Sequence, residues 1–261
     1  MTTTLLVGST ADELSKELIE RIAKLCRHSV EERGVFNVAV SGGSMPKILA
    51  SLAGAEGVDW SKCKIWFADE RCVPLDHGDS NYKAWAELFS SSGIPKENVI
   101  SVNTDLSPED AAAAYETKLR ASFPADGSDQ LPCFDASLLG VGPDGHTCSL
   151  FPGHPLLGET GKWVAHIEDS PKPPPQRVTL TYPVLNNSRN VFFIGTGQSK
   201  ASLLPQLLSV TEGGMLKSAG GSSPYPAARV TVAVGRELLW CVDQAAASQC
   251  PPEIMALASK C

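Results

Sequence analysis

Residues 140–147 combine an acid and a histidine in one glycine-rich stretch. They read Gly-Val-Gly-Pro-Asp-Gly-His-Thr, with Asp144 and His146 two positions apart and Gly142 and Gly145 beside them. A neutral imidazole, with an ordinary pKa of about 6.5, accepts a proton from water near neutral pH. A lone loop histidine is often only a surface residue, but the glycine frame after an apolar run favours a site. The pattern predicts catalytic roles for Asp144 and His146.

A second glycine motif, Ser-Gly-Gly-Ser at residues 41–44, follows an apolar run and precedes Pro46. Glycine lets backbone N–H groups turn toward a ligand, and the start of a helix adds partial positive charge. Gly42, Gly43 and Ser44 can therefore cradle a phosphate. The same tetrapeptide also suits an ordinary tight turn, and the pattern alone leaves both interpretations open.

Charged residues follow another apolar run at residues 64–68. Asp69, Glu70 and Arg71 stand directly behind it. An exposed ion pair there would contribute little stability. Their position at the carboxyl end of a predicted strand favours a site, with Asp69 and Arg71 as candidates.

Two further cations begin predicted elements. Arg177 follows the proline-rich residues 169–175 and opens an apolar run. Lys200 falls in the first turn of a predicted helix after Gly195-Thr-Gly197. A cation at a helix start conflicts with the helix dipole unless an anion is bound, which hints at a functional role.

The elements that must position these residues alternate along the chain. Apolar spacing predicts helices at residues 11–26, 46–53, 82–89, 111–123 and 198–208. Short apolar runs predict strands at residues 35–40, 64–68, 134–141, 178–182, 191–194 and 238–242. This alternation predicts one α/β domain over residues 1–261, with a doubly wound, mainly parallel sheet and helices on both faces. Ligands bind beyond the carboxyl ends of such strands.

Composition narrows the class of protein. The 261 residues carry a formal net charge of −7, which argues against nucleic acid as the main partner. No apolar stretch is long enough for a membrane span, and residues 1–8 lack the basic flank of a signal peptide. The eight cysteines have irregular spacing without a Cys-x-x-Cys pair, which predicts reduced thiols and no zinc site.

Five motifs in order resemble the 6-phosphogluconolactonase family. They are Ser41-Gly-Gly-Ser44, Asp69-Glu-Arg71-x-Val-Pro74 with Ser80-Asn81-Tyr82, Gly140-Val-Gly-Pro-Asp-Gly-His146-Thr with Ser149-Leu-Phe-Pro152, Pro173-Pro-Pro-Gln-Arg177-Val-Thr-Leu-Thr181, and Gly197-Gln-Ser-Lys200. The resemblance covers roughly residues 35–252. It implies the doubly wound fold shared with glucosamine-6-phosphate deaminase.

The resemblance also implies residue roles and a reaction. The phosphate site of the family matches Gly42, Gly43, Ser44, Arg177 and Lys200. The catalytic histidine matches His146, and the acid and base at the strand end match Asp69 and Arg71. The expected reaction is hydrolysis of 6-phospho-D-glucono-1,5-lactone to 6-phosphogluconate in the oxidative pentose phosphate pathway, without cofactor or metal.

In the expected mechanism, His146 takes a proton from the attacking water and returns it to the ring oxygen. Asp144 orients the imidazole or helps to hold the water. The oxyanion is stabilised by Arg71 or by backbone N–H groups near Gly42 to Ser44, and the sequence leaves this choice open. No Gly-x-Ser-x-Gly nucleophile elbow is present, which favours direct attack by water.

Two alternatives remain. A deaminase and isomerase of amino-sugar phosphates shares the fold, but similar deaminases carry a glutamate five residues after the histidine, where this chain has Phe151. A non-catalytic sugar-phosphate sensor would keep the cradle and lose His146.

We expect a cytoplasmic protein. The end Ser259-Lys260-Cys261 resembles a peroxisomal address except at its last residue, which leaves a peroxisome-like organelle as the minority option. Oligomeric state stays open between a monomer and a weak dimer.

Overall fold

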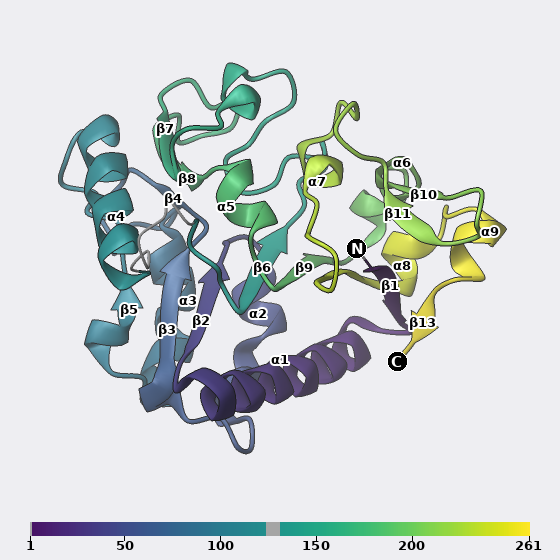
Figure 1. The fold of residues 1–261 in the computed structure, drawn as a ribbon, viewed down its shortest axis with the longest axis horizontal. Helices are drawn as coiled ribbons and strands as arrows, with labels where there is room; N and C mark the ends of the chain where they lie inside the picture. The colour runs from purple at the N-terminus through teal and green to yellow at the C-terminus, as the bar shows by residue number, and fades with distance from the viewer. Residues whose placement is uncertain (1, 124–130) are drawn as a thin grey trace.

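The computed structural model describes residues 2–123 and 131–261. Its centre is a sheet in which every neighbouring pair of strands runs parallel, in the order β13-β1-β12-β9-β6-β2-β3-β5 (Figure 1). The strands are β1 (Thr2–Gly8), β2 (Phe36–Val40), β3 (Cys63–Phe67), β5 (Val99–Ile100), β6 (Ala136–Gly140), β9 (Asn190–Gly195), β12 (Glu237–Asp243) and β13 (Ser259–Lys260). The predicted mainly parallel sheet is confirmed.

Helices cover both faces of this sheet, as predicted. They are α1 (Ala11–Arg33), α2 (Met45–Ile48), α3 (Asn81–Ser92), α4 (Pro108–Ser122), α5 (Tyr182–Asn186), α6 (Leu204–Leu207), α7 (Pro226–Arg229), α8 (Gln244–Ala247) and α9 (Pro252–Met255). Alternate strand residues enter different cores: Leu138 and Phe192 pack with α1 and α3, while Leu139 and Phe193 pack with α4 and α5. The side-chain period of two along each strand thus builds two apolar layers.

Two smaller sheets flank the central one. An antiparallel sheet joins β4 (Asp69–Arg71), β8 (Arg177–Leu180) and β7 (Val164–Ile167), with Arg71 opposite Arg177. A hairpin joins β10 (Leu208–Val210) and β11 (Leu216–Ser218). The predicted strand at residues 178–182 is present as β8, but it ends at Leu180 because Tyr182 begins α5, and it belongs to the small antiparallel sheet that lies over the carboxyl end of β3.

Several predicted boundaries move for identifiable reasons. Helix α1 continues beyond residue 26 to Arg33, where Gly34 adopts a left-handed conformation with φ of 74° and ends it. The predicted helix at residues 198–208 was wrong in extent. A 3-10 turn covers Gln198–Lys200, and α6 starts only at Leu204, with Pro205 in its first turn. Because proline lacks an N–H group, Pro205 fits the start of α6 but not the interior of a longer helix.

The helix predicted at residues 46–53 is likewise shorter than expected. Helix α2 is followed by a 3-10 helix over Ala50–Gly54, and the two together occupy the predicted span.

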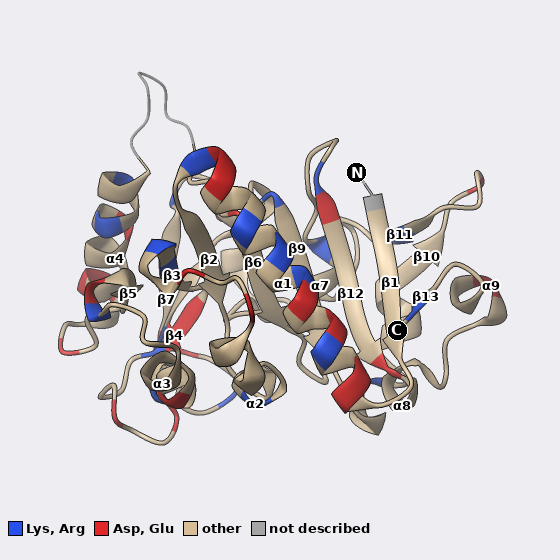
Figure 2. Cartoon of the chain, turned by 90° about the horizontal axis from the view of Figure 1, so that it is seen from below, with Lys and Arg blue, Asp and Glu red and all other residues tan. Residues whose placement is uncertain are grey.

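Within the described residues, no helix combines the length and apolar character that a membrane crossing requires. Figure 2 shows acidic and basic residues interspersed along α1, while the interiors of the central strands carry few charges.

Candidate active site

The candidate site lies where four neighbouring strands of the sheet end. A cavity of 230 Å³ opens at the carboxyl ends of β2, β3, β6 and β9. Its lining combines the predicted glycine motifs with charged side chains: Ser41, Gly42, Gly43, Ser44, Met45, Asp69, Arg71, Gly140, Val141, Gly142, His146, Cys148, Ile194, Gly195 and Lys200. After β5 the chain returns to place β6 beside β2, so the cavity sits where the strand order reverses.

The acid and histidine predicted from the sequence lie side by side. Nδ1 of His146 is 2.5 Å from Oδ1 of Asp144, and the imidazole packs on the ring of Phe151 with centroids 4.8 Å apart. Gly142 makes this geometry possible, because a Cβ at that position would lie 2.0 Å from Nδ1 of His146. The turn is closed by the backbone, since the N–H of Gly142 donates to the carbonyl of His146 at 2.8 Å.

Burial and neighbouring charges shift the pKa values of both His146 and Asp144. Burial lowers the pKa of His146 below its ordinary value and outweighs the opposing effect of Asp144. Burial acts to raise the pKa of Asp144, but its contacts with His146 and Lys172 prevail and hold that pKa at about 2. Near neutral pH the structure therefore combines an ionised Asp144 with a neutral imidazole.

Lys172 is a part of this site that the sequence analysis missed. Its Nζ lies 3.0 Å from Oδ1 of Asp144 and 3.1 Å from Nδ1 of His146. It comes from the proline-rich residues 169–175, which directly precede Arg177 and its neighbour Gln176 in the sequence. The sequence shows only a lysine inside a stiff proline-rich segment, and this pattern does not predict which side chains the lysine contacts.

The predicted phosphate cradle, residues 42–44, has backbone N–H groups that are available to a ligand. The N–H groups of Gly42, Gly43 and Ser44 donate to no acceptor within the described residues. A Cβ at Gly42 would lie 1.8 Å from Oδ1 of Asn81, so glycine is required for the close approach of the cradle to α3. Gly43 has φ of 73°, which suits glycine and turns the chain into α2.

Asp69 and Arg71 both line the cavity, while Glu70 between them does not. Asp69 is 3% exposed, and its carboxylate accepts hydrogen bonds from Ser41 at 2.6 Å and from Ser149 at 3.1 Å. Nη1 of Arg71 donates to the carbonyl of Asp79 at 2.6 Å, whereas its buried Nε has no partner within the described residues. Asp69 thus connects two serines, and the buried Nε–H of Arg71 is left for a ligand.

Glu70 has a structural task. Its carboxylate accepts from the backbone N–H groups of Arg71, Asn81 and Tyr82, and so caps the start of α3. Burial raises the pKa of Glu70 above its ordinary value, and these three N–H groups oppose the rise. The three consecutive charges that follow the strand therefore divide into two cavity residues and one helix cap.

The two predicted phosphate-binding cations occupy different surroundings. Lys200 lines the cavity, and burial together with nearby Lys172 lowers its pKa. Lys200 lies in a 3-10 turn rather than at the start of a long helix, so the unfavourable helix dipole at this position is weaker than the sequence suggested. Arg177 is not among the lining residues, and its guanidinium donates to the carbonyls of Pro174, Lys172 and Pro173, each at 3.0 Å.

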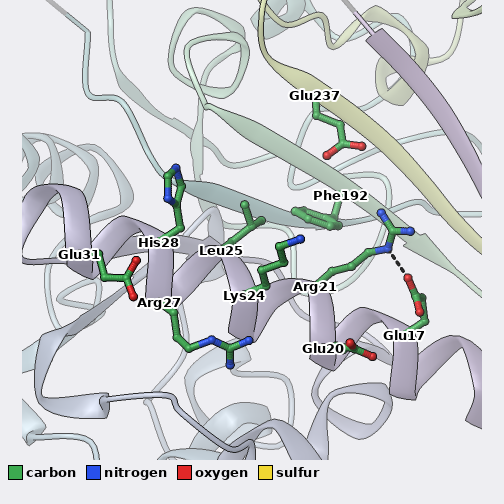
Figure 3. Close-up of a pocket in the computed structure, with 10 residues that line it drawn as sticks. All are labelled: Glu17, Glu20, Arg21, Lys24, Leu25, Arg27, His28, Glu31, Phe192 and Glu237. Atoms are coloured by element: carbon green, nitrogen blue, oxygen red, sulfur yellow. Dashed lines mark hydrogen bonds and ion pairs between the residues drawn. The ribbon is translucent and has the colours of Figure 1, made fainter.

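A larger groove of 830 Å³ lies elsewhere, between α1 and the strand residues Phe192 of β9 and Glu237 of β12 (Figure 3). Figure 3 shows acidic and basic side chains mixed along it, with Arg21 paired to Glu17 at 2.6 Å. It lacks the backbone cradle and the acid–histidine pair. Among the described residues, no cluster of three or more His, Cys, Asp or Glu side chains has the arrangement of a metal site.

Comparison with known proteins agrees with the geometry. The model of the family "Glucosamine-6-phosphate isomerases/6-phosphogluconolactonase" matches residues 9–240. A human protein named 6-phosphogluconolactonase is 44% identical over 248 residues, which cover 92% of this chain and 91% of that protein. The crystal structure of a 6-phosphogluconolactonase from Thermotoga maritima superposes with a TM-score of 0.75 at 30% identity, covering 93% of this chain and 100% of that one.

A monomeric glucosamine-6-phosphate deaminase superposes with a TM-score of 0.67 at 19% identity, covering 95% of this chain and 100% of the deaminase. That likeness concerns the fold alone and confirms the architecture expected from the motifs. The family match over residues 9–240 and the 44% identity to the human protein establish membership. This chain belongs to the glucosamine-6-phosphate isomerase/6-phosphogluconolactonase family.

Proposed function

We propose that this protein is a hydrolase that opens 6-phospho-D-glucono-1,5-lactone to 6-phosphogluconate, a step of the oxidative pentose phosphate pathway. One observation carries the proposal: a histidine paired with a carboxylate shares a 230 Å³ cavity with a backbone cradle and a lysine. The cradle suits a phosphate, and the pair suits activation of water. The family relatives named 6-phosphogluconolactonase support the same reaction.

The base in this scheme is His146. Nδ1 donates to the carboxylate of Asp144 when it carries the proton, which leaves the lone pair on Nε2. Nε2 takes a proton from water as the water attacks the lactone carbonyl. The imidazolium then returns the proton to the ring oxygen as the carbon–oxygen bond breaks. Asp144 stays ionised throughout and stabilises the imidazolium between the two transfers.

Arg71 is our choice for the oxyanion. Its buried Nε has no partner within the described residues, and the residue lines the cavity that holds His146. A buried guanidinium N–H without an acceptor gains one when the carbonyl oxygen becomes negative. This assignment leaves the backbone donors of Gly42, Gly43 and Ser44, with Lys200, for the phosphate.

The roles of Arg177 and Asp69 remain predictions. The carbonyl contacts of Arg177 support a role in holding the proline-rich segment, in addition to the proposed phosphate contact. The serine contacts of Asp69 support a role in fixing Ser41, which precedes the cradle.

The deaminase alternative is less well supported. Phe151, which occupies the position of the expected glutamate, is 1% exposed and packs on the imidazole of His146. A phenyl ring neither accepts nor relays a proton. The contact keeps the imidazole in apolar surroundings, which favours its neutral form. That environment suits a histidine base better than a relay of three titratable groups.

The direct test uses purified protein and two substrates. Fresh 6-phosphogluconolactone should release acid faster with the protein than without it, and glucosamine 6-phosphate should release no ammonia. A lactone that opens at the uncatalysed rate, with ammonia released from the amino sugar, would reverse the assignment.

We also propose that the protein acts in the cytoplasm. Ser259 and Lys260 pair with Leu6 and Val7 of β1, and the N–H of Cys261 donates to the carbonyl of Val7 at 3.2 Å. A tripeptide whose backbone is engaged in a sheet edge is less accessible to a targeting receptor than a free tail. Imaging a fluorescent fusion with a free carboxyl terminus tests this, and membrane-bounded puncta would refute it.

A further inference from the structure

Lys172 is the charged residue nearest to the proposed base that no motif had assigned. Its ammonium group contacts both members of the catalytic pair, at 3.0 Å from Oδ1 of Asp144 and 3.1 Å from Nδ1 of His146. About a third of its side chain is exposed, at 34%. The three groups form a triangle in which a cation lies against the side of the imidazole that faces Asp144.

The backbone around Lys172 is fixed from both sides. Its N–H donates to Oγ of Ser170 at 3.2 Å, and the same hydroxyl donates to its carbonyl at 2.7 Å. Nη2 of Arg177 donates to that carbonyl at 3.0 Å. The N–H of Ser170 donates to the carbonyl of Pro175 at 3.1 Å and closes the loop. A lysine on a backbone held in this way reaches Asp144 with less loss of freedom than one on an open loop.

We infer that Lys172 is a positioning residue for the proposed lactone hydrolysis: it holds Asp144 against Nδ1 of His146 and keeps the imidazole uncharged in the free enzyme. The inference rests on the proposed function. Arg177 contributes indirectly, because its contact with the carbonyl of Lys172 maintains the conformation of the loop.

The charges explain what such a residue contributes. An ionised carboxylate 2.5 Å from an imidazole favours the imidazolium, which is useless as a base. An ammonium group beside Nδ1 opposes that effect while leaving the hydrogen bond intact. Accordingly, burial is the main cause of the lowered pKa of His146, Lys172 lowers it further, and Asp144 and Asp69 raise it.

Other charged and titratable groups also face the imidazole across the cavity. They come from several elements, namely Asp69 and Arg71 of β4, Cys148 of the loop after β6, and Lys200 of the 3-10 turn after β9. Lys172 differs from these in its direct contact with Nδ1. Removing its charge should therefore change the protonation of His146.

A competing interpretation makes Lys172 a phosphate ligand, because it lies close enough to Lys200 to lower the pKa of that residue. In that case its removal would weaken substrate binding and leave the titration of His146 unchanged. The two interpretations thus separate in a measurement that needs no substrate.

The experiment is an NMR titration of protein labelled with carbon-13 at histidine Cε1. The five histidines give five signals, and the His146→Gln variant assigns the one that matters. Lys172→Met removes the charge, Lys172→Arg retains it, and Lys24→Met on the exposed side of α1 is the matched control. The pH profile of kcat/KM is recorded for the same proteins.

We expect the pKa of His146 to rise by about 0.5 to 1 unit in Lys172→Met, a modest shift because Lys172 is partly exposed. The acid limb of kcat/KM should move by the same amount. Lys172→Arg and Lys24→Met should titrate like the unaltered protein. The titration itself shows whether each variant is folded, since a folded chain keeps dispersed histidine signals.

An unchanged pKa of His146 in Lys172→Met would overturn the inference. If KM for the lactone rose in that variant as well, Lys172 would be a phosphate ligand. A shifted titration in a protein without lactonase activity would keep the effect of Lys172 on His146 and refute the proposed function instead. The two failures are therefore distinguishable.

Discussion

Gly142→Ala is a substitution that clashes with the proposed catalytic pair itself. The added Cβ would lie 2.0 Å from Nδ1 and 2.1 Å from Cε1 of His146, and 2.7 Å from Oδ1 of Asp144. One methyl group thus collides with both members of the catalytic pair. Neither side chain is lost, so any effect measures their placement rather than their presence.

The size of the effect follows from these distances. Ordinary contact begins at 3.4 Å, so the imidazole has to retreat by about 1.4 Å. A displacement of about 1 Å in a catalytic group costs roughly 100-fold in rate, so kcat should fall by about 100-fold or more. The side chains of His146 and Asp144 are 18% and 35% exposed and can move toward the cavity. The loss of stability should therefore stay within about 1 to 3 kcal/mol.

The assay is kcat for release of acid from 6-phosphogluconolactone, with folding checked by circular dichroism at the assay temperature. Gly54→Ala is the matched control, because a Cβ at Gly54 meets no atom within 4 Å. It should keep both kcat and stability. If Gly142→Ala folds and retains kcat within about threefold of the unaltered protein, the position of His146 is not what limits the reaction.

Further predictions concern the phosphate, the loop and metals. Lys200→Ala removes one charge-assisted contact worth about 1.5 to 3 kcal/mol, so KM should rise about 10- to 150-fold with kcat nearly unchanged. Arg177→Ala should raise KM by a similar factor through the phosphate, and an unchanged KM with a lowered kcat would instead restrict Arg177 to the loop that carries Lys172. Activity should survive exhaustive EDTA treatment, and loss of activity with recovery on adding one divalent ion would contradict the metal-free scheme.

The sequence predicted the central strands and the placement of the main site residues well. Runs such as residues 35–40 and 191–194 are mostly apolar on both faces and end at Ser41-Gly42 and at Gly195, which is typical of buried parallel strands. Parallel strands end at one edge, so the residues behind β2, β3 and β6 had to meet there. Gly42, Asp69 and His146 were found by this reasoning, and all three line the cavity.

What the sequence could not predict depends on contacts between distant segments. Lys172 reaches Asp144 across 28 positions of the chain, and no local pattern encodes how the proline-rich loop folds back. From the sequence alone, Arg177 is interpreted as a free cation, because only the fold of that loop brings its three carbonyl acceptors into reach. Strand β1 was missed because its apolar run, Leu5 to Val7, is only three residues long, although Gly8 follows it.

The central claim is that His146 acts as the base of a lactonase, and its most direct test is the pH profile of kcat/KM for 6-phosphogluconolactone in the unaltered protein and in His146→Gln. Burial lowers the pKa of His146, so its neutral form persists below the ordinary range. The acid limb of the unaltered protein should therefore have its midpoint below about 6.5. His146→Gln should lose about 10²- to 10⁴-fold in kcat and lose this limb, because an amide accepts no proton in this range. A His146→Gln protein with near-unaltered kcat and the same acid limb would show that the base lies elsewhere.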